Sequence, residues 1–499
     1  MQNIAIIDCE SQGASTATAR LISISGILVN SDLQLLDKFE LFCSNVPGYI
    51  PDPYALWVNK GLKKLKESNM SHLALMTELH KYINKWSRPP NAPNGCVWAS
   101  WNGIGFDYPL IQKENYKSLL PIYITNTGGS HHSDFLPVAR AAKLFIPDCL
   151  ETNYSMKGNP IFKLDNLGPK NFPELDQNLF HTATQDCAVT LKIMQKLKDK
   201  AKPIYDAAME TASKKNAKNL ISNTKIFTTV FYYFGKARPF AVCKFFDHKI
   251  YQWPMVYCLE NDPRDLMALD YKSLKETMKR PGKFVRALPL KHPLILDIAY
   301  ALKMEPYKKI KLETLMARAD MLRDNPKFAE NCSQALAEIA EEKTIQKDSE
   351  RNLEVQLDPH NQLYSGNFPS EADQEIMQKF HSTNNWEERY KLVLSLSDNR
   401  FKYFGLRLIY QNQPDALPSN EYLKIHVDTA RRVLSLKEEN YTTIPQAEAL
   451  IDTIRAEKDI TKEKLDYMNE VDQMIKEMRI TYEKALIDSV KAKKKEEVA

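Results

Sequence analysis

Near the start of the chain, the apolar run Ile4–Ile7 leads directly into two acidic residues, Asp8 and Glu10. Residues two apart on a β-strand project from the same face, so these two carboxylates are expected side by side. Like charges are costly in such a place unless cations bind them. A strand that merely ends in polar residues explains an isolated D-x-E pattern more often than a site does. The pair therefore needs support from elsewhere in the chain.

A second acidic position follows another short apolar run. The segment Cys96–Trp101 predicts a buried strand, and Asn102-Gly103-Ile104-Gly105-Phe106-Asp107-Tyr108-Pro109 comes directly after it. Proline suits the first turn of a helix, so Asp107 stands where a helix is expected to begin. This position is compatible with two roles, a plain helix N-cap or a metal ligand.

The third acidic position belongs to His181-Thr182-Ala183-Thr184-Gln185-Asp186. Thr182 and Gln185 have the spacing of a capping box, which places His181 just before a helix and Asp186 about one turn inside it. A carboxylate on a helix is held rigidly, whereas a histidine in the preceding loop can approach a substrate and leave it. This arrangement suits a metal ligand paired with a general base. An isolated loop histidine, by contrast, is more often structural or exposed.

The order of these three elements is more informative than any one of them. Four carboxylates and one histidine match the needs of two-metal phosphodiester hydrolysis. Hard cations about 4 Å apart take oxygen ligands, and a base with a pKa near ~6.5 accepts a proton from water. The sequence therefore predicts a hydrolytic site with Asp8, Glu10, Asp107 and Asp186 as metal ligands and His181 as base.

Composition limits the remaining possibilities. A chain of 499 residues with 43% hydrophobic content is expected to bury two or three cores rather than one. No stretch approaches the ~18 apolar residues of a membrane span, so we expect no membrane insertion and a cytoplasmic protein. The eight cysteines are scattered without a C-x-x-C pair, which argues against a zinc module and against a disulfide framework.

Hydrophobic patterning predicts three domains, at residues 1–200, 203–352 and 358–499. The first reads as α/β, with strands expected at Ile4–Ile7, Leu21–Val29 and Leu33–Cys43 and helices at Met70–Trp86 and Thr184–Lys198. The second reads as β-rich, with strand-like runs at Lys225–Phe234, Phe240–Phe246 and Ile250–Tyr257 and a helix or linker at Glu338–Asn352. The third is rich in Leu, Lys, Glu and Arg and ends in a long periodic helix near Lys462–Val490.

Positive charge is concentrated in one stretch of the chain. Residues 201–310 contain 20 Lys/Arg against 10 Asp/Glu, a balance of +10, while the whole chain carries only +5. Such a stretch is compatible with phosphate contacts and equally with a solvated basic face. The basic residues that could either contact phosphates or simply be solvated are Lys214, Lys215, Lys218, Lys225, Lys236 and Arg238. The neighbouring aromatics, which could stack on unpaired bases but are more simply explained as core, are Phe227, Phe231, Tyr232, Tyr233 and Phe234.

With these residues in place, the chain resembles the DEDDh 3′-to-5′ exonucleases, and within them the bacterial exodeoxyribonuclease I family. The resemblance extends well beyond the motifs. It includes Gly48-Tyr49-Ile50-Pro51-Asp52, His132-Ser133-Asp134-Phe135-Leu136 with Arg140-Ala141-Ala142, Phe162-Lys163-Leu164-Asp165-Asn166-Leu167, Leu363-Tyr364-Ser365-Gly366-Asn367-Phe368 and Trp386-Glu387-Glu388-Arg389-Tyr390. This coverage separates the chain from the short DEDDh proteins.

The resemblance implies a ribonuclease-H-like exonuclease domain, an SH3-like barrel and an all-α C-terminal domain that together form a C-shaped clamp. It implies release of 5′-mononucleotides from single-stranded DNA in repair or recombination, with two Mg²⁺ ions that Mn²⁺ can replace. Asp8, Glu10 and Asp186 would hold the metal that carries the nucleophilic water, and Asp107 would lie near the second. A monomer that docks the acidic C-terminal tail of the single-stranded-DNA-binding protein is also implied.

Substrate contacts are expected from Glu10, Ser11, Gln12, Asn102, Phe106, Lys163, Lys225 and Arg238. Ser11 and Gln12 depart from the family, which usually has threonine and then an aromatic or small residue; Gly13 is retained. Two alternatives stay open, a 3′-to-5′ exoribonuclease and a single-strand-binding scaffold with a vestigial site. Retention of all five catalytic residues argues against the scaffold.

Overall fold

A computed structural model describes residues 2–89, 93–175, 182–280, 282–350, 358–364, 367–437 and 439–498, with backbone alone for 347–350 and 492–498. The first part of the chain is built on a five-stranded sheet in the order β3-β2-β1-β4-β5. β1 (Ile4–Ser11), β2 (Leu21–Val29) and β3 (Leu35–Phe42) form the antiparallel meander that the sequence predicts. β4 (Val97–Ser100) and β5 (His131–Asp134) extend the other edge of β1 in parallel.

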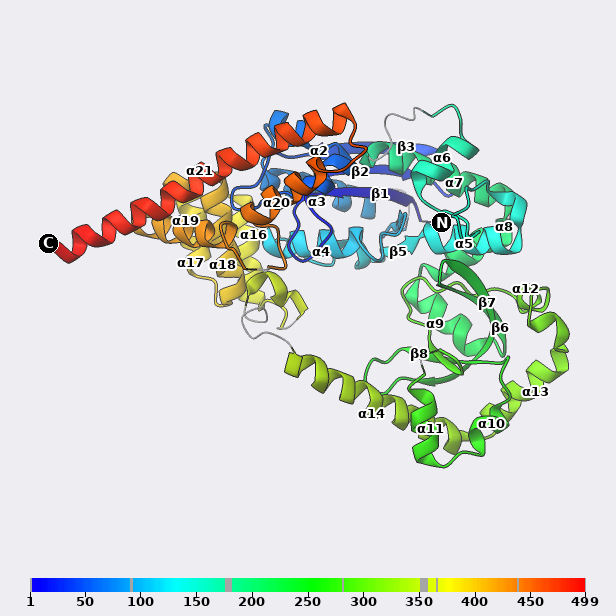
Figure 1. Cartoon of the computed structure of the whole chain (residues 1–499). Helices are drawn as coiled ribbons and strands as arrows, with labels where there is room; N and C mark the ends of the chain where they lie inside the picture. The colour runs from blue at the N-terminus through cyan, green and yellow to red at the C-terminus, as the bar shows by residue number, and fades with distance from the viewer. Residues whose placement is uncertain are drawn as a thin grey trace.

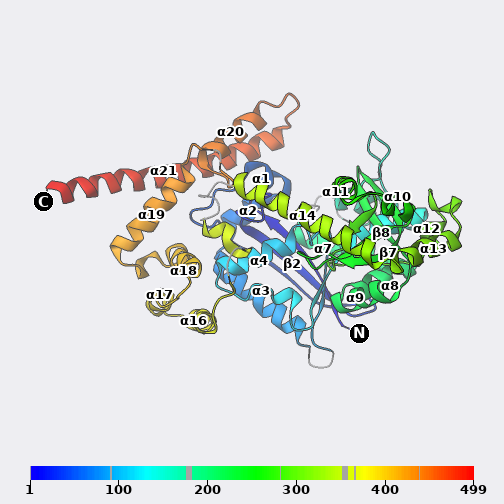
Figure 2. The ribbon, with the colours of Figure 1, turned by 90° about the horizontal axis from the view of Figure 1, so that it is seen from below.

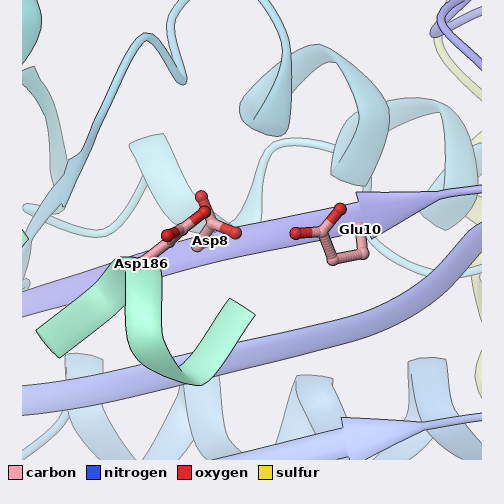
Figure 3. Close-up of side chains that lie close together, drawn as sticks. All are labelled: Asp8, Glu10 and Asp186. Carbon is pink, nitrogen blue, oxygen red and sulfur yellow. The ribbon is translucent and has the colours of Figure 1, made fainter. Parts of the chain in front are cut away.

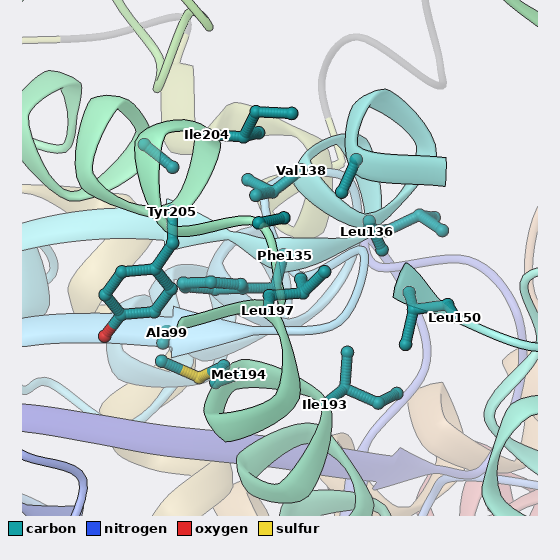
Figure 4. Close-up of a cluster of buried hydrophobic side chains, with 14 of the residues drawn as sticks. Ala99, Phe135, Leu136, Val138, Leu150, Ile193, Met194, Leu197, Ile204 and Tyr205 are labelled. Atoms are coloured by element: carbon teal, nitrogen blue, oxygen red, sulfur yellow. The ribbon is translucent and has the colours of Figure 1, made fainter. Parts of the chain in front are cut away.

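Helices cover both faces of this sheet, and alternation along β1 decides which residues meet which helices. Ile4 and Ile6 face a core shared with α5 (Phe135–Phe145), α7 (Ala183–Lys200) and α8 (Lys202–Thr211), shown in Figure 4. Ala5, Ile7 and Cys9 face the opposite core, formed with α3 (His72–Ser87) and α4 (Asp107–Lys117). Asp8 and Glu10 continue the first series, so both emerge on the α7 face. Shorter helices complete this part: α1 (Pro53–Asn59), α2 (Gly61–Glu67) and α6 (Leu164–Asn171).

The second part is a four-stranded antiparallel sheet with helices on both faces. Its strands pair in the order β6-β7-β8-β9, with bounds Phe227–Tyr233, Lys236–Asp247, Pro254–Cys258 and Val285–Ala287. One face meets α9 (Lys214–Asn223), and the other meets α11 (Tyr271–Met278), α13 (Leu312–Arg323) and α14 (Pro326–Glu350). α10 (Pro263–Met267) and α12 (Ala299–Leu302) are short. The SH3-like barrel stays a prediction, because the described strands pair as an open series.

The third part is entirely helical over the described residues. Its elements are η5 (Pro359–Tyr364), α16 (Glu371–Ser382), α17 (Trp386–Leu394), α18 (Asn399–Asn412), α19 (Ser419–Val433), α20 (Ile444–Arg455) and α21 (Lys462–Val498). Two apolar cores join it to the first part. One packs Ile50 and Leu56 against α19, α20 and α21, and the other packs Tyr116 and Leu119 against α16 and α18.

The three parts give the ribbon the outline of a C. In Figure 1 the second part hangs from one end of the first, and the C-terminal helices lie at the other end. α14 runs from the second part back beneath the first, which Figure 2 shows from below. Within the described residues, none of the helices has both the length and the apolar content that crossing a bilayer requires.

The predicted types of secondary structure agree with this structure, but the predicted shares of helix and strand in the second part do not. The α/β first part and the all-α third part are confirmed. In the second part the three predicted strands are present, but helices occupy more of the chain than the strand-like patterns indicate, and β9 has only three residues. All eight cysteines are free and buried, as expected of reduced thiols.

Candidate active site

Three of the predicted carboxylates converge on the α7 face of the sheet. Asp8, Glu10 and Asp186 each offer a carboxylate oxygen within 4.8 Å of the other two, and all three side chains are partly exposed. Figure 3 shows Asp8 and Glu10 rising from β1 and Asp186 approaching from the first turn of α7. Two residues on the same face of β1 thus lie beside a residue of α7, and 178 positions of sequence separate Asp8 from Asp186.

The start of α7 fixes the position of Asp186. Thr182 is the N-cap, and its side chain accepts a hydrogen bond from the backbone N–H of Gln185. The backbone N–H of Asp186 donates to the Thr182 carbonyl at 3.0 Å. A carboxylate in a first helical turn is stabilised by the helix dipole, so this helix start favours an acidic residue here. The predicted cap and the predicted place of Asp186 agree with the structure.

Asp107 is attached to β1 rather than capping its own helix. It is the first residue of α4, whose N-cap is Phe106 without a side-chain cap bond. Its Oδ1 accepts a hydrogen bond of 2.9 Å from the backbone N–H of Cys9, the residue between Asp8 and Glu10. The side chain is 4% exposed. The interpretation of Asp107 as a plain helix N-cap is therefore wrong, because its carboxylate accepts a hydrogen bond from a strand amide that is distant in sequence.

The loop before Asp107 needs two unusual backbone positions. Asn102 has a φ of 67°, and its N–H donates to Asp134 Oδ1 at 2.9 Å. A Cβ on Gly103 would lie 2.1 Å from Ser100 Oγ and 3.0 Å from Asp107 Oδ2. Only glycine fits there without displacing those atoms, so the tight turn holds Asp107 close to β1.

Crowding of like charge shifts the acidity of these groups. Burial, and then the neighbouring Asp107, Asp186 and Glu10, raise the pKa of Asp8 well above its usual value. Burial together with Asp186 and Asp107 does the same to the pKa of Glu10. Burial raises the pKa of Asp107 to about 7, although its hydrogen bond from Cys9 opposes the shift. Clusters of carboxylates with raised pKa values are common at functional sites.

The donor set suits a hard divalent cation. The clustered ligand atoms are carboxylate oxygens, as Mg²⁺, Mn²⁺ and Ca²⁺ prefer. The mutual repulsion that raises the pKa of Asp8 is the interaction that a bound cation would remove. Asp8, Glu10 and Asp186 therefore fit a cation, with Asp107 next to them.

A cleft of about 610 Å³ opens beside the carboxylates. Asp8 and Asp186 line it together with the predicted contacts Asn102 and Lys163. The far wall comes from the second part, through Tyr232 and Gly235 of the β6–β7 hairpin. Arg140 of α5 also lines the cleft, with its guanidinium carbon 3.5 Å from the centre of the Tyr232 ring.

Arg140 and Tyr232 are site candidates that sequence reasoning did not place here. In the sequence, Arg140 is one residue of a family-like run, and Tyr232 is one of five neighbouring aromatics. The local signal is an arginine in the middle of the mostly apolar helix Phe135–Phe145, whose other charged residue, Lys143, lies in its last turn. Their meeting depends on how the second part docks on the first, which local pattern does not report.

Two predicted substrate contacts are engaged within the protein. The Ser11 hydroxyl donates to the Gly13 carbonyl at 2.7 Å, and the Gln12 amide donates to Asn45 Oδ1 at 2.8 Å. Both side chains are buried. Gln12 also borders a separate cavity of about 280 Å³ between the β1–β2 loop and the C-terminal helices. Phe106 is half-buried against the core under α3 and α4.

The basic candidates of the second part fall into different surroundings. Lys225 forms an ion pair with Asp320 at 2.6 Å. Arg238, on β7, lies over the ring of Tyr233 at 4.9 Å. Lys214 and Lys215, at the start of α9, line a cleft of about 350 Å³ together with Lys291, and its described lining includes no carboxylate. We name this the basic cleft.

His181 lies outside the described residues, so its role as base stays a prediction.

Comparison with known proteins adds two findings. Residues 357–478 match the family model described as the exonuclease I C-terminal domain. No curated protein matches the chain by sequence. Solved structures, however, match over nearly the full length of both chains.

Three of these structures illustrate the match. A moderately thermophilic exonuclease I from Methylocaldum szegediense is 18% identical, with a TM-score of 0.77 over 96% of this chain and 100% of its own. E. coli exonuclease I in complex with a dT13 oligonucleotide is also 18% identical, with a TM-score of 0.76 over 96% of this chain and 100% of its own. A structure described as an ExoI/SSB-Ct complex is 18% identical, with a TM-score of 0.74 over 96% of this chain and 99% of its own. Residues 357–478 are therefore similar to the exonuclease I C-terminal domain, and the chain as a whole has the fold of exonuclease I.

Proposed function

We propose that this protein is a 3′-to-5′ exonuclease that hydrolyses single-stranded DNA to 5′-mononucleotides. The observation that carries the proposal is the convergence of Asp8, Glu10 and Asp186, with Asp107 tied to the same strand, at one end of a cleft. The exonuclease I fold supports it. The proposed domains are those of the sequence, residues 1–200, 203–352 and 358–499.

The proposed chemistry is two-metal phosphodiester hydrolysis. Bound Mg²⁺ ions, or Mn²⁺ in their place, would polarise the scissile phosphate and lower the pKa of the attacking water. Asp8, Glu10 and Asp186 would hold the ions, and Asp107, bonded to the backbone of Cys9 between Asp8 and Glu10, would lie near the second of them. Arg140 and Lys163 line the cleft beside these carboxylates and are placed to contact the backbone of the bound strand. His181 takes the proton from water.

The clefts support an unpaired strand as substrate. The site cleft is walled by Tyr232 on one side and by the loop of Asn102 on the other. The basic cleft offers Lys214, Lys215 and Lys291 to phosphates farther along the strand. Among structures of similar fold, one is described as E. coli exonuclease I bound to dT13, and another as a zinc-bound complex of the E. coli enzyme with single-stranded DNA.

We propose two further features on the same basis. The acidic tail of a single-stranded-DNA-binding protein is the expected protein partner, as a structure of similar fold is described as an ExoI/SSB-Ct complex. A cytoplasmic role in DNA repair or recombination suits eight thiols that are all free and buried, because such thiols persist in reducing compartments.

The decisive experiment is digestion of single-stranded DNA, double-stranded DNA and single-stranded RNA of matched sequence, each labelled at its 5′ end. We expect a ladder that shortens from the 3′ end on single-stranded DNA alone, with Mg²⁺ and not with chelator. A ladder on RNA would replace this proposal with an exoribonuclease. Binding of the strand without cleavage would indicate a scaffold with a vestigial site.

A further inference from the structure

A short segment of the first part, Val46–Asp52, is bonded to several of the C-terminal helices. The Gly48 N–H donates to the Tyr482 hydroxyl of α21 at 2.7 Å, and the Gln411 amide of α18 donates to the Pro47 carbonyl at 3.2 Å. Gly48 has a φ of +85°, and a Cβ there would lie 2.7 Å from Thr429 Cγ2 of α19. We call residues 46–52 the bracket.

Tyr49 connects the bracket to a buried polar chain in the third part. Its hydroxyl lies 2.9 Å from His360 Nε2, and His360 Nδ1 lies 2.8 Å from Asp358 Oδ1. An ionised carboxylate can only accept hydrogen bonds, so His360 donates from Nδ1 to Asp358. Its Nε2 then accepts a hydrogen bond from the Tyr49 hydroxyl. Asp358 is also paired with Arg432 at 3.0 Å. Burial lowers the pKa of His360 to about 3, so this arrangement stays fixed at neutral pH.

The other end of the bracket reaches the loop that follows the catalytic strand. The Asp52 N–H donates to the Gln12 carbonyl at 2.7 Å, and the Gln12 N–H donates to the Arg20 carbonyl at 2.8 Å. Glu10, one of the site carboxylates, stands two residues before Gln12. We name residues 11–20 the site loop. A displacement of the bracket is therefore a displacement of the site loop.

The Tyr49 ring contacts a second route, which leads to α4. Its face lies 4.7 Å from the Arg20 guanidinium, and Arg20 is ion-paired with Glu114 of α4 at 3.3 Å. Lys117 pairs with the same carboxylate at 3.0 Å and also donates to the Ala19 carbonyl. Arg20, Glu114 and Lys117 are each at most 2% exposed. α4 begins with Asp107, so this charged cluster joins the bracket to the other carboxylate-bearing element.

We infer that the bracket makes the C-terminal helices a positioning device for the active site, with Tyr49 and His360 as its central residues. The C-terminal part is thereby required for turnover, and not only for holding a strand. This inference rests on the proposed function for its catalytic consequence. Its structural consequence, the ordering of the site loop by the third part, is independent of any substrate.

Tyr49→Phe is the sharpest test, because it removes the hydroxyl bonded to His360 and leaves the ring against Arg20. Tyr54→Phe is the matched control, since Tyr54 is 54% exposed on α1. We expect amide hydrogen exchange across residues 11–20 and 46–52 to become about fivefold faster in Tyr49→Phe, the change that one lost buried hydrogen bond produces. Exchange in α11 and α13 of the second part should match the wild type.

Kinetics of the full-length protein supply the second readout. Tyr49→Phe should lower the single-turnover rate on a 5′-labelled oligonucleotide about fivefold, with the Kd in chelator changed less than twofold. Unchanged exchange in the site loop would overturn the inference. Faster exchange with a wild-type cleavage rate would also overturn it, because the bracket would then be merely structural. A wild-type protein that cuts no nucleic acid would remove the proposed function, while the exchange comparison would still decide the bracket.

A second variant guards against an uninformative Tyr49 change. Gly48→Ala places a methyl against Thr429 and strains the backbone, so it should perturb the site loop more than Tyr49→Phe. Combining it with Thr429→Ser removes the Cγ2 methyl and should restore part of the lost turnover. Equal turnover in the single and double variants, both at the wild-type level, would count against the bracket.

Discussion

Asp107 is the residue whose surroundings differ most from what its local sequence indicates. Its position before Pro109 predicts a helix cap, yet its carboxylate is bonded to the Cys9 amide. Order along the chain was enough to select Asp8, Glu10, Asp107 and Asp186 as a set. Their attachments could not be predicted, because each depends on a partner that is distant in sequence and brought near by the sheet.

Asp186→Asn tests the metal assignment at a single residue. Replacing a ligand oxygen by an amide should lower kcat about 10³-fold while strand binding is retained, and it should abolish the rise in Tm that Mg²⁺ produces. Asp199→Asn is the control, since Asp199 is exposed near the end of the same helix. Wild-type turnover in Asp186→Asn would sink the assignment.

His181→Ala tests the predicted general base. We expect kcat to fall roughly 10²-fold with an unchanged Kd for the oligonucleotide, the usual effect of a lost proton acceptor. The acidic limb of the pH–rate profile should disappear with the imidazole. A variant that keeps both the rate and the limb would exclude His181 from the mechanism.

At the scale of elements, the helices and strands that are long and strongly periodic were predictable, and their docking was not. Alternation along β1 and the cap at Thr182 placed the carboxylates correctly. The strand β9, with three residues, carries too little pattern to be recognised. Arg140 and Tyr232 belong to elements of different parts, so their contact follows only from the packing of those parts.

The turn before α4 offers a test of how closely Asp107 must be held. Gly103→Ala would force Ser100 and Asp107 apart, so we expect lower stability and a smaller Mg²⁺-induced rise in Tm. Gly105→Ala in the same turn meets its nearest atom at 3.5 Å, an ordinary contact, and serves as control. Equal Tm shifts in the two variants would show that the turn does not set the site.

The start of α9 carries a prediction about salt. If Lys214 contacts a phosphate, Lys214→Ala should weaken strand binding and reduce the slope of log K against log salt by about 0.7. Lys225→Ala should leave the slope unchanged, because Lys225 is occupied by Asp320. Titrations of a labelled oligonucleotide at several salt concentrations measure both. Identical slopes for Lys214→Ala and the wild type would remove the basic cleft from the strand path.

At the scale of the whole molecule, several buried histidines make the fold sensitive to acid. Burial lowers the pKa to about 4 for His72, His80, His292 and His381, and to about 3 for His132 and His360. Between pH 6.5 and 4 these six histidines bind more protons in the unfolded chain than in the folded one, which lowers the free energy of unfolding as pH falls. The raised pKa values of Asp8, Glu10 and Asp107 act in the opposite direction, but these groups are half as many.

We expect the Tm, measured at constant ionic strength, to decrease from pH 7 to pH 5. His80→Gln should decrease less, because its amide can keep the bond to Asn115 Oδ1 without titrating. A Tm that is flat or rises over this range would contradict the assignment of these histidines as neutral.

The central place of β1 also has a consequence for biosynthesis. Its neighbour β2 follows at once, but its other neighbour, β4, begins 93 residues later, and Asp186 comes later still. At a translation rate of about 5–20 residues per second, the first carboxylate waits roughly ten to forty seconds for the last one. One edge of β1 is open to wrong pairing until β4 is available, so we expect the nascent chain to depend on chaperones most strongly before residue 97 has left the ribosome.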